Sequence, residues 1–224
     1  MDKWYLLRNA INNKNYEEAV SLLYDISKGI VSDKKLFYSS LMILTNAGYI
    51  ADVKIILAKT YTSKSDDDLK KIIFNSIDEY EKKCSLSNEQ LEITTRCIKM
   101  IREAFTYEEY ELVYDLCEWG YYVSQLPIFL YYEGKCFYKC QMYDVASELL
   151  LKYVNLGSEK VSKAYLYLTR ISSLKKEKKQ YVDYQRKMKI ADMTNLNSFY
   201  FYDLTDSSVD KRKAYLQVNS LFNY

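Results

Sequence analysis

The sequence predicts an all-helical protein built from antiparallel pairs of helices. Apolar residues recur at helical spacing from the beginning of the chain to about residue 192. The 224 residues include only five Gly and one Pro, the residues that most often interrupt helices or form tight turns. Short polar links separate the periodic segments, so consecutive helices are expected to run antiparallel.

The expected helices follow one another with links of mostly two to five residues. They cover residues 2–12, 16–29, 34–47, 50–62, 66–83, 88–105, 107–120, 126–140, 143–155, 158–174 and 177–192. In the first half, Ser32 and Asp33 precede one expected helix start. The acidic run Ser65-Asp66-Asp67-Asp68 places carboxylates in a first turn, where they meet the positive end of the helix dipole.

The second half of the chain carries further helix-start chemistry. Ser87 with Gln90, and Thr106 with Glu109, have the spacing of capping boxes, in which two side chains satisfy the first backbone N–H groups. Pro127 is suited to a first helical turn because it lacks an N–H that would be unpaired there anyway.

One segment suggests that the helical pairs repeat. Between residues 130 and 150, Gly134, Phe137, Ala146 and Leu150 stand at the spacing of a helical hairpin with small residues at the helix crossing. In this segment the chain resembles a tetratricopeptide repeat. Glu133 departs from that pattern, which asks for Leu before the glycine.

Other segments repeat parts of the same pattern. Ala19 and Val53 lie 34 residues apart, and Val113 and Ala146 lie 33 apart, close to the tetratricopeptide period of about 34. Val53 and Val113 are 60 residues apart, so the stretch from residue 70 to 83 is expected to form a shortened or unusual unit. The last hairpin matches the pattern poorly.

The resemblance implies a right-handed superhelix of antiparallel hairpins, an α-solenoid, over residues 1–192, with about five to six hairpins. A generic helical solenoid outside the family is the alternative. Residues 193–224 change character and contain the aromatic run Phe199-Tyr200-Phe201-Tyr202. A solenoid must cover its terminal face, so this segment is interpreted as a C-terminal cap, or alternatively as a docking tail.

Composition excludes several classes of function. The chain has no His, so neither a Ser-His-Asp nor a Cys-His constellation exists, and no His can bind metal. The net charge of +2 does not call for nucleic acid or an anionic membrane, and no apolar run is long enough to span a bilayer. Five scattered Cys favour free thiols in a reducing compartment, and hence a cytoplasmic protein. We expect no cofactor and no enzyme activity.

Three clusters of side chains could form functional sites, but each also has a structural explanation. Cys136 and Cys140 share a helix face and could form half of a metal site, but buried thiols are the simpler interpretation. The acidic clusters at residues 66–68 and 108–109 are explained by helix starts. The basic helix at 175–189 could contact phosphates or an acidic protein, although a solvated face is the preferred explanation.

The resemblance also implies a partner-binding groove, because the first helices of successive tetratricopeptide hairpins line a concave surface. Its inward positions here would be Trp4, Arg8, Tyr38, Met42, Ile98, Arg102, Tyr131, Lys135, Tyr138 and Lys139. This set is aromatic and basic and would suit an acidic or C-terminal peptide segment. Packing between helices is the competing explanation for the aromatic members. Arg8 stands where chaperone-binding members place the first Asn of their carboxylate clamp, so that function is not carried over.

We therefore expect an interaction scaffold or adaptor that binds a protein or peptide partner in this groove. A peptide-sensing or regulatory module acting on another protein is the alternative. An RNA-binding helical repeat is a weaker one, because the charge is nearly balanced and the basic residues are scattered.

Overall fold

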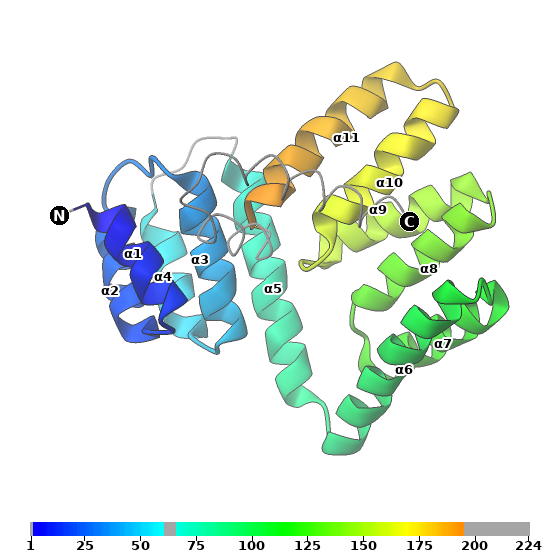
Figure 1. Cartoon of the computed structure of the whole chain (residues 1–224), viewed down its shortest axis with the longest axis horizontal. Coiled ribbons are helices and arrows are strands. Elements are labelled where there is room, and N and C mark those ends of the chain that lie inside the picture. Colours follow the sequence, from blue (N-terminus) through cyan, green and yellow to red (C-terminus); the bar gives the residue numbers. More distant parts are fainter. Residues whose placement is uncertain (1, 61–65, 195–224) are drawn as a thin grey trace, which may run out of the picture.

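The computed structural model describes residues 2–60 and 66–194, and the expected C-terminal cap lies almost wholly outside them (Figure 1). Within these ranges the protein is all-helical, with packing between adjacent helices as predicted. The helices are α1 (Lys3–Asn12), α2 (Tyr16–Ser27), α3 (Lys34–Asn46), α4 (Ile50–Lys59), α5 (Asp67–Ser85), α6 (Asn88–Thr106), α7 (Tyr110–Ser124), α8 (Ile128–Lys139), α9 (Tyr143–Leu156), α10 (Val161–Leu174) and α11 (Lys178–Ala191), followed by the short 3₁₀ turn η2 (Asp192–Thr194).

Most of the expected helix starts are confirmed, and one is wrong. Asp33 caps α3 by accepting a hydrogen bond from the N–H of Leu36, and Ser87 and Gln90 form a capping box at α6. Thr106 does not begin a helix. It ends α6, and its hydroxyl donates to the carbonyl of Arg102 one turn earlier, so no capping box forms before α7.

Five helical hairpins share one turn geometry, which is the clearest sign of repetition in the described chain. The turns of α1–α2, α3–α4, α6–α7, α8–α9 and α10–α11 each contain a residue in the left-handed region: Lys14, Gly48, Glu108, Gln141 and Lys176. In every case the next residue donates its N–H to the carbonyl five positions back, at 2.8–3.0 Å. This pattern is a Schellman motif, which ends a helix by pairing its last carbonyls.

The small residues predicted at the helix crossing of the α8–α9 hairpin lie where the two helices approach closely. Gly134 of α8 is buried, and a Cβ added to it would lie 2.8 Å from the Cγ of Leu150 in α9. Ala146 is fully buried in the same contact, as are its counterparts Ala19 and Val53 in earlier hairpins. The fifth hairpin differs, since Ala191 is the one residue of α11 that is buried.

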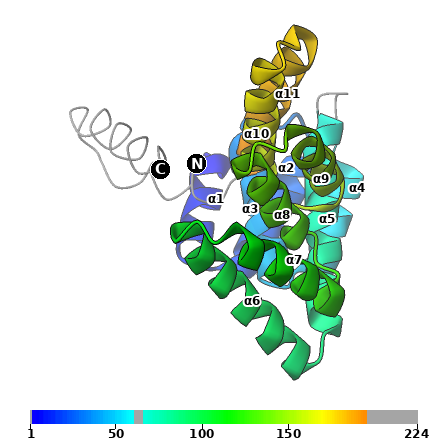
Figure 2. The same ribbon diagram turned by 90° about the vertical axis from the view of Figure 1, so that its right-hand side faces the viewer.

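Helix α5 pairs with no second helix of its own and instead joins two cores. Leu69, Ile73 and Ile77 lie on one face and pack into the core of α1–α4. Ile72 lies to one side of this face and joins the core of α6–α11. Figure 1 shows α5 between the two groups of helices, and Figure 2 shows α6–α11 in front of α1–α4. The unusual unit expected at residues 70–83 is therefore this single helix.

A buried carboxylate fastens the C-terminal hairpins to α5. Glu79 of α5 accepts hydrogen bonds from the backbone N–H (2.9 Å) and the hydroxyl (3.0 Å) of Ser158, which lies between α9 and α10. Nearby, Asn75 donates to the carbonyl of Gly157, and Lys83 pairs with Glu159 at 3.1 Å. Farther along, η2 packs against α3 and α5, so the hairpins curl back toward the first half of the chain (Figure 1). We call the contact between Glu79 and Ser158 the clasp.

Candidate functional site: a basic face on α6, α8 and α10

The structure separates the predicted groove residues into distant groups. Trp4 and Arg8 lie on α1, at the far end of the molecule from α6 and α8 (Figure 1). Tyr38 and Met42 are buried in the core of α1–α5, where they take no part in an accessible surface. The groove therefore does not run continuously through all the hairpins, because α5 interrupts the series after α4.

The remaining predicted residues come together on the first helices of the third and fourth hairpins. Arg102 and Lys139 are exposed, while Ile98, Lys135 and Tyr138 are half-buried. Tyr131 is only 4% exposed and forms part of the floor beneath them. This group is joined by residues that the sequence analysis did not select: Lys160, Lys163 and Arg170, at the beginning and along the length of α10. We call the surface formed by Arg102, Lys135, Lys139, Lys160, Lys163 and Arg170 the basic face.

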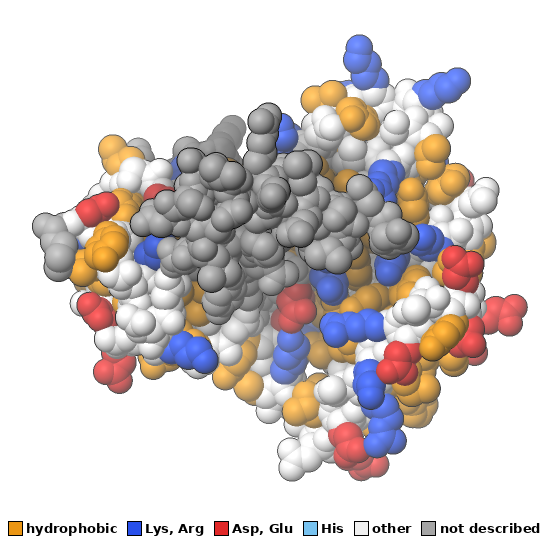
Figure 3. Space-filling model, viewed as in Figure 1, with side chains coloured by type: hydrophobic (Ala, Val, Ile, Leu, Met, Phe, Trp, Pro, Cys, Tyr) orange, Lys and Arg blue, Asp and Glu red, His pale blue; other side chains and the backbone are white. Residues whose placement is uncertain are grey.

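Three of these cations hold the same position relative to their own hairpin turn. Arg102, Lys135 and Arg170 each stand six residues before the left-handed residue of their own hairpin turn. They therefore occupy equivalent positions on α6, α8 and α10 and follow one another across the array. The position of Arg102 and Lys135 within their hairpins, applied to the next hairpin, leads to Arg170 in the sequence. Figure 3 shows Lys and Arg side chains gathered on this part of the molecule.

Aromatic rings form the floor of the basic face. Tyr131 contacts Tyr132 and Tyr167, with ring centroids 5.4 and 6.3 Å apart, and Tyr138 lies 4.9 Å from Tyr167. These contacts connect α8 to α10. The rings support cations that lie above them: the ammonium of Lys135 is 3.8 Å from the ring centre of Phe105, on α6.

Further cations lie on the same floor. The Nζ of Lys160 is 5.8 and 5.9 Å from the ring centres of Tyr131 and Tyr132. The Nε of Arg102 donates to the hydroxyl of Tyr132 at 3.2 Å. The floor thus holds three cations, from α6, α8 and the start of α10, around Phe105 and the pair Tyr131 and Tyr132.

The basic face is electrostatically unbalanced. Burial, and then the neighbouring charges of Lys139, Lys160 and Lys163, lower the pKa of Lys135 to about 8. Burial and the charges of Lys163 and Arg102 also lower the pKa of Lys160. Across residues 2–60 and 66–194 no carboxylate forms an ion pair with Lys135 or Lys160, and the nearby Glu159 already pairs with Lys83. An anion placed here would remove repulsion between like charges.

The opposite charge gathers on α7. Between Glu103 and Lys135 the chain contains acidic residues but no Lys or Arg. Glu111, Asp115 and Glu118 are exposed on α7, beside the stacked and exposed rings of Trp119 and Tyr122. The near-zero net charge of the sequence therefore conceals two surfaces of opposite sign, a separation that only the placement of the helices reveals.

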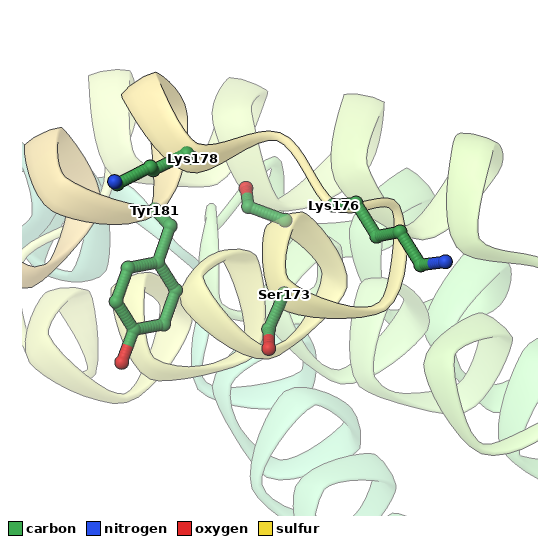
Figure 4. Close-up of a pocket in the computed structure, with 5 residues that line it drawn as sticks. Ser173, Lys176, Lys178 and Tyr181 are labelled. Carbon is green, nitrogen blue, oxygen red and sulfur yellow. The ribbon is translucent and has the colours of Figure 1, made fainter.

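A separate small pocket lies at the tip of the α10–α11 hairpin (Figure 4). Its volume is about 200 Å³, and it is lined by Ser172, Ser173, Lys176, Lys178 and Tyr181. This volume is below the range of about 300–1,000 Å³ usual for small-molecule sites. The ammonium groups of Lys176 and Lys178 point in opposite directions in Figure 4, so they do not converge on one anion.

The remaining sequence-based candidates have structural roles. Cys136 is buried, and its thiol donates to the carbonyl of Tyr110, whereas Cys140 is exposed. The part of the chain that the structure describes contains no group of three or more metal-ligating side chains. None of the described helices is both long enough and apolar enough to cross a bilayer.

Comparisons with protein-family models, with curated protein sequences and with solved structures found no match to this chain. The basic face is therefore the feature from which a function can be inferred.

Proposed function

We propose that this protein is an interaction module that holds an acidic segment of a partner protein on the basic face. The observation that carries the proposal is the half-buried Lys135, which lies among three other lysines and forms no ion pair with any carboxylate of the described residues. A cation in that position is repelled by its neighbours, and a bound carboxylate would offset the repulsion. Basic residues at one repeat position on the first helices of three successive hairpins also match an extended acidic chain better than a single small ligand.

The proposal includes membership of the tetratricopeptide-like class of right-handed superhelices, in a cytoplasmic setting. The five identical hairpin turns and the close crossing of Gly134 with Leu150 support that assignment. The single helix α5 is its main departure from a regular array. A regulatory module that responds to a bound peptide would use the same surface and is a variant of the same proposal.

RNA is a weaker ligand for this surface. Proteins that bind single-stranded RNA stack bases on exposed aromatic rings. Here Tyr131 and Tyr132 are each only 4% exposed and are packed against other rings. The cations of the basic face therefore favour charge recognition without base stacking.

The test is charge reversal on the basic face with a matched control elsewhere. The variant Lys135→Glu/Arg170→Glu should weaken binding of acidic peptides at least tenfold in fluorescence anisotropy at 0.1 M salt. The control Lys178→Glu/Lys179→Glu changes the same net charge on α11, where both lysines are exposed. Equal loss in both variants would mean that total charge, not the basic face, governs binding. Full binding by the first variant would refute the proposal.

A further inference from the structure

One part of the basic face concentrates more positive charge than a single carboxylate neutralises. Arg102, Lys135 and Lys160 surround the ring pair of Phe105 and Tyr132, whose centroids are 6.3 Å apart. Each cation comes from a different helical hairpin, so the fold brings together groups that are far apart in sequence.

The local balance of charge indicates the kind of anion. Three cations face this position, and the one acid near them, Glu159, attracts Lys160 and Arg102 but is shared with Lys83, its ion-pair partner at 3.1 Å. A glutamate or aspartate of a partner would supply one negative charge and two acceptor oxygens. A phosphate monoester supplies about −1.5 to −2 charges at pH 7 and three acceptor oxygens.

Donor chemistry favours the same ligand. Guanidinium groups bind phosphate through paired N–H donors, and ammonium groups act as compact point charges beside them. Arg102 already donates from Nε to Tyr132, which fixes the position of its guanidinium and leaves its terminal N–H groups for a ligand. Lys160 stands at the cap position of α10, so the first N–H groups of that helix add partial positive charge.

From this arrangement we infer that Arg102, Lys135 and Lys160 form a subsite for a phosphate monoester carried by a phosphorylated side chain of the partner segment. This inference rests on the proposed function, because the remainder of the partner would occupy the rest of the basic face. It adds that phosphorylation of the partner switches the strength of the interaction. The phosphate of a free small molecule shares this chemistry and is separated from a phosphorylated side chain by the experiment.

The experiment uses the full chain and three pools of 15-residue peptides with randomised acidic flanks. The pools are identical except for the central residue, which is Ser, Glu or phosphoserine. We expect the phosphoserine pool to bind at least tenfold more tightly than the Glu pool at 0.1 M salt. Lys135→Met or Lys160→Met should reduce this phosphate-specific gain to threefold or less. The control Lys179→Met, at an exposed lysine of α11 outside the basic face, should retain it. Thermal melts would confirm that all variants are folded.

The outcomes separate the inference from the function on which it rests. Equal binding of the Glu and phosphoserine pools would overturn the phosphate subsite but leave the acidic-segment proposal standing. Failure of all three pools to bind would overturn both. Complete displacement of the phosphoserine pool by millimolar inorganic phosphate, but not by chloride of equal ionic strength, would assign the subsite to free phosphate and contradict the peptide source. Equally tight binding of a single-stranded oligonucleotide, lost in Lys135→Met, would assign it to nucleic acid.

Discussion

The clasp between α5 and the α9–α10 link gives a sharp prediction about stability and pH. Glu79 is 6% exposed and Ser158 is 4% exposed, so the carboxylate is held almost without water. Burial, and then the charge of Glu159, raise the pKa of Glu79 from 4.5 to about 7, although Lys83 and the hydrogen bonds from Ser158 oppose the increase. The folded protein therefore binds a proton at Glu79 more tightly than the unfolded chain does.

The direction of the pH effect follows from this difference. Because the pKa is raised in the folded state, the stabilising contribution is fully present below about pH 4.5 and is lost as the pH rises through about 7. Each pKa unit corresponds to about 1.4 kcal/mol, so the group accounts for about 3 kcal/mol between pH 4.5 and pH 8. The variant Glu79→Gln keeps the acceptor for the N–H of Ser158 but cannot ionise. Its stability should therefore not fall as the pH rises through about 7.

Urea unfolding of the wild type and of Glu79→Gln, at pH values from 4.5 to 8, measures the effect. The free energies of unfolding should agree near pH 4.5, and the variant should become more stable by about 3 kcal/mol at pH 8. Other titrating groups, such as the half-buried Glu133, affect both proteins and cancel in the difference. Parallel curves at all pH values would refute the argument that ionisation of Glu79 opposes the closed arrangement. Glu79→Ala should be less stable than Glu79→Gln at every pH, because it leaves two buried groups of Ser158 without a partner.

Three further predictions concern packing, ligand binding and thiol chemistry. Gly134→Ala should lower the free energy of unfolding by about 1–3 kcal/mol in urea titrations, because its Cβ would meet the facing leucine of α9 at 2.8 Å. Gly29→Ala should be neutral, because its Cβ would lie 3.9 Å from the nearest atom of another part of the chain, and equal effects of the two substitutions would contradict the close crossing. Binding of acidic peptides should weaken as the pH rises through about 8, because Lys135 loses its proton there. Lys135→Arg should remove this pH dependence in anisotropy titrations, because a guanidinium stays charged. An unchanged pH profile in the variant would show that the charge of Lys135 does not contribute to binding. Cys84 and Cys140 are exposed and should react rapidly with a thiol reagent such as 5,5′-dithiobis(2-nitrobenzoate). The three buried thiols have pKa values raised by burial and should react only when the protein unfolds. More than two rapidly reacting thiols in the native protein would contradict the packing.

The sequence predicted the helices well because their ends depend on local chemistry. Side-chain caps such as those of Asp33 and Ser87 act within three residues, so they can be recognised without knowledge of the fold. The capping box predicted for Thr106 and Glu109 is wrong because a Ser or Thr hydroxyl can also donate to a carbonyl one turn earlier inside a helix. The spacing of the two residues is the same whether the Thr begins a helix or ends one.

The arrangement of the hairpins was harder to predict because it depends on contacts between distant segments. The 60-residue interval indicated an irregular unit, but not that α5 would stand alone and pack into both cores. For that reason Tyr38 and Met42, which occupy groove positions in a regular array, are buried here. The clasp joins residues 79 positions apart, and nothing in the sequence around Glu79 or Ser158 indicates the pairing.

The basic face could be predicted in part. The repeat register gave Arg102 and Lys135 and, taken one hairpin further, leads to Arg170. Lys160 has no equivalent at that position, because it lies at the cap of α10 and meets the tyrosine floor through a contact between distant segments. Composition obscured the site as well, since the acidic α7 balances the charge of the chain.

Site-specific photo-crosslinking tests the central claim most directly. A photoreactive amino acid would replace Lys139 on the basic face or, as the matched control, Tyr122 on the outer side of α7, where both positions are exposed. Mass spectrometry would then identify the crosslinked segment of each partner. The account predicts crosslinks from position 139 to segments rich in Asp, Glu or phosphorylated residues, and few from position 122. Crosslinks that arise from position 122 alone, or that join position 139 to segments without an excess of negative charge, would contradict it.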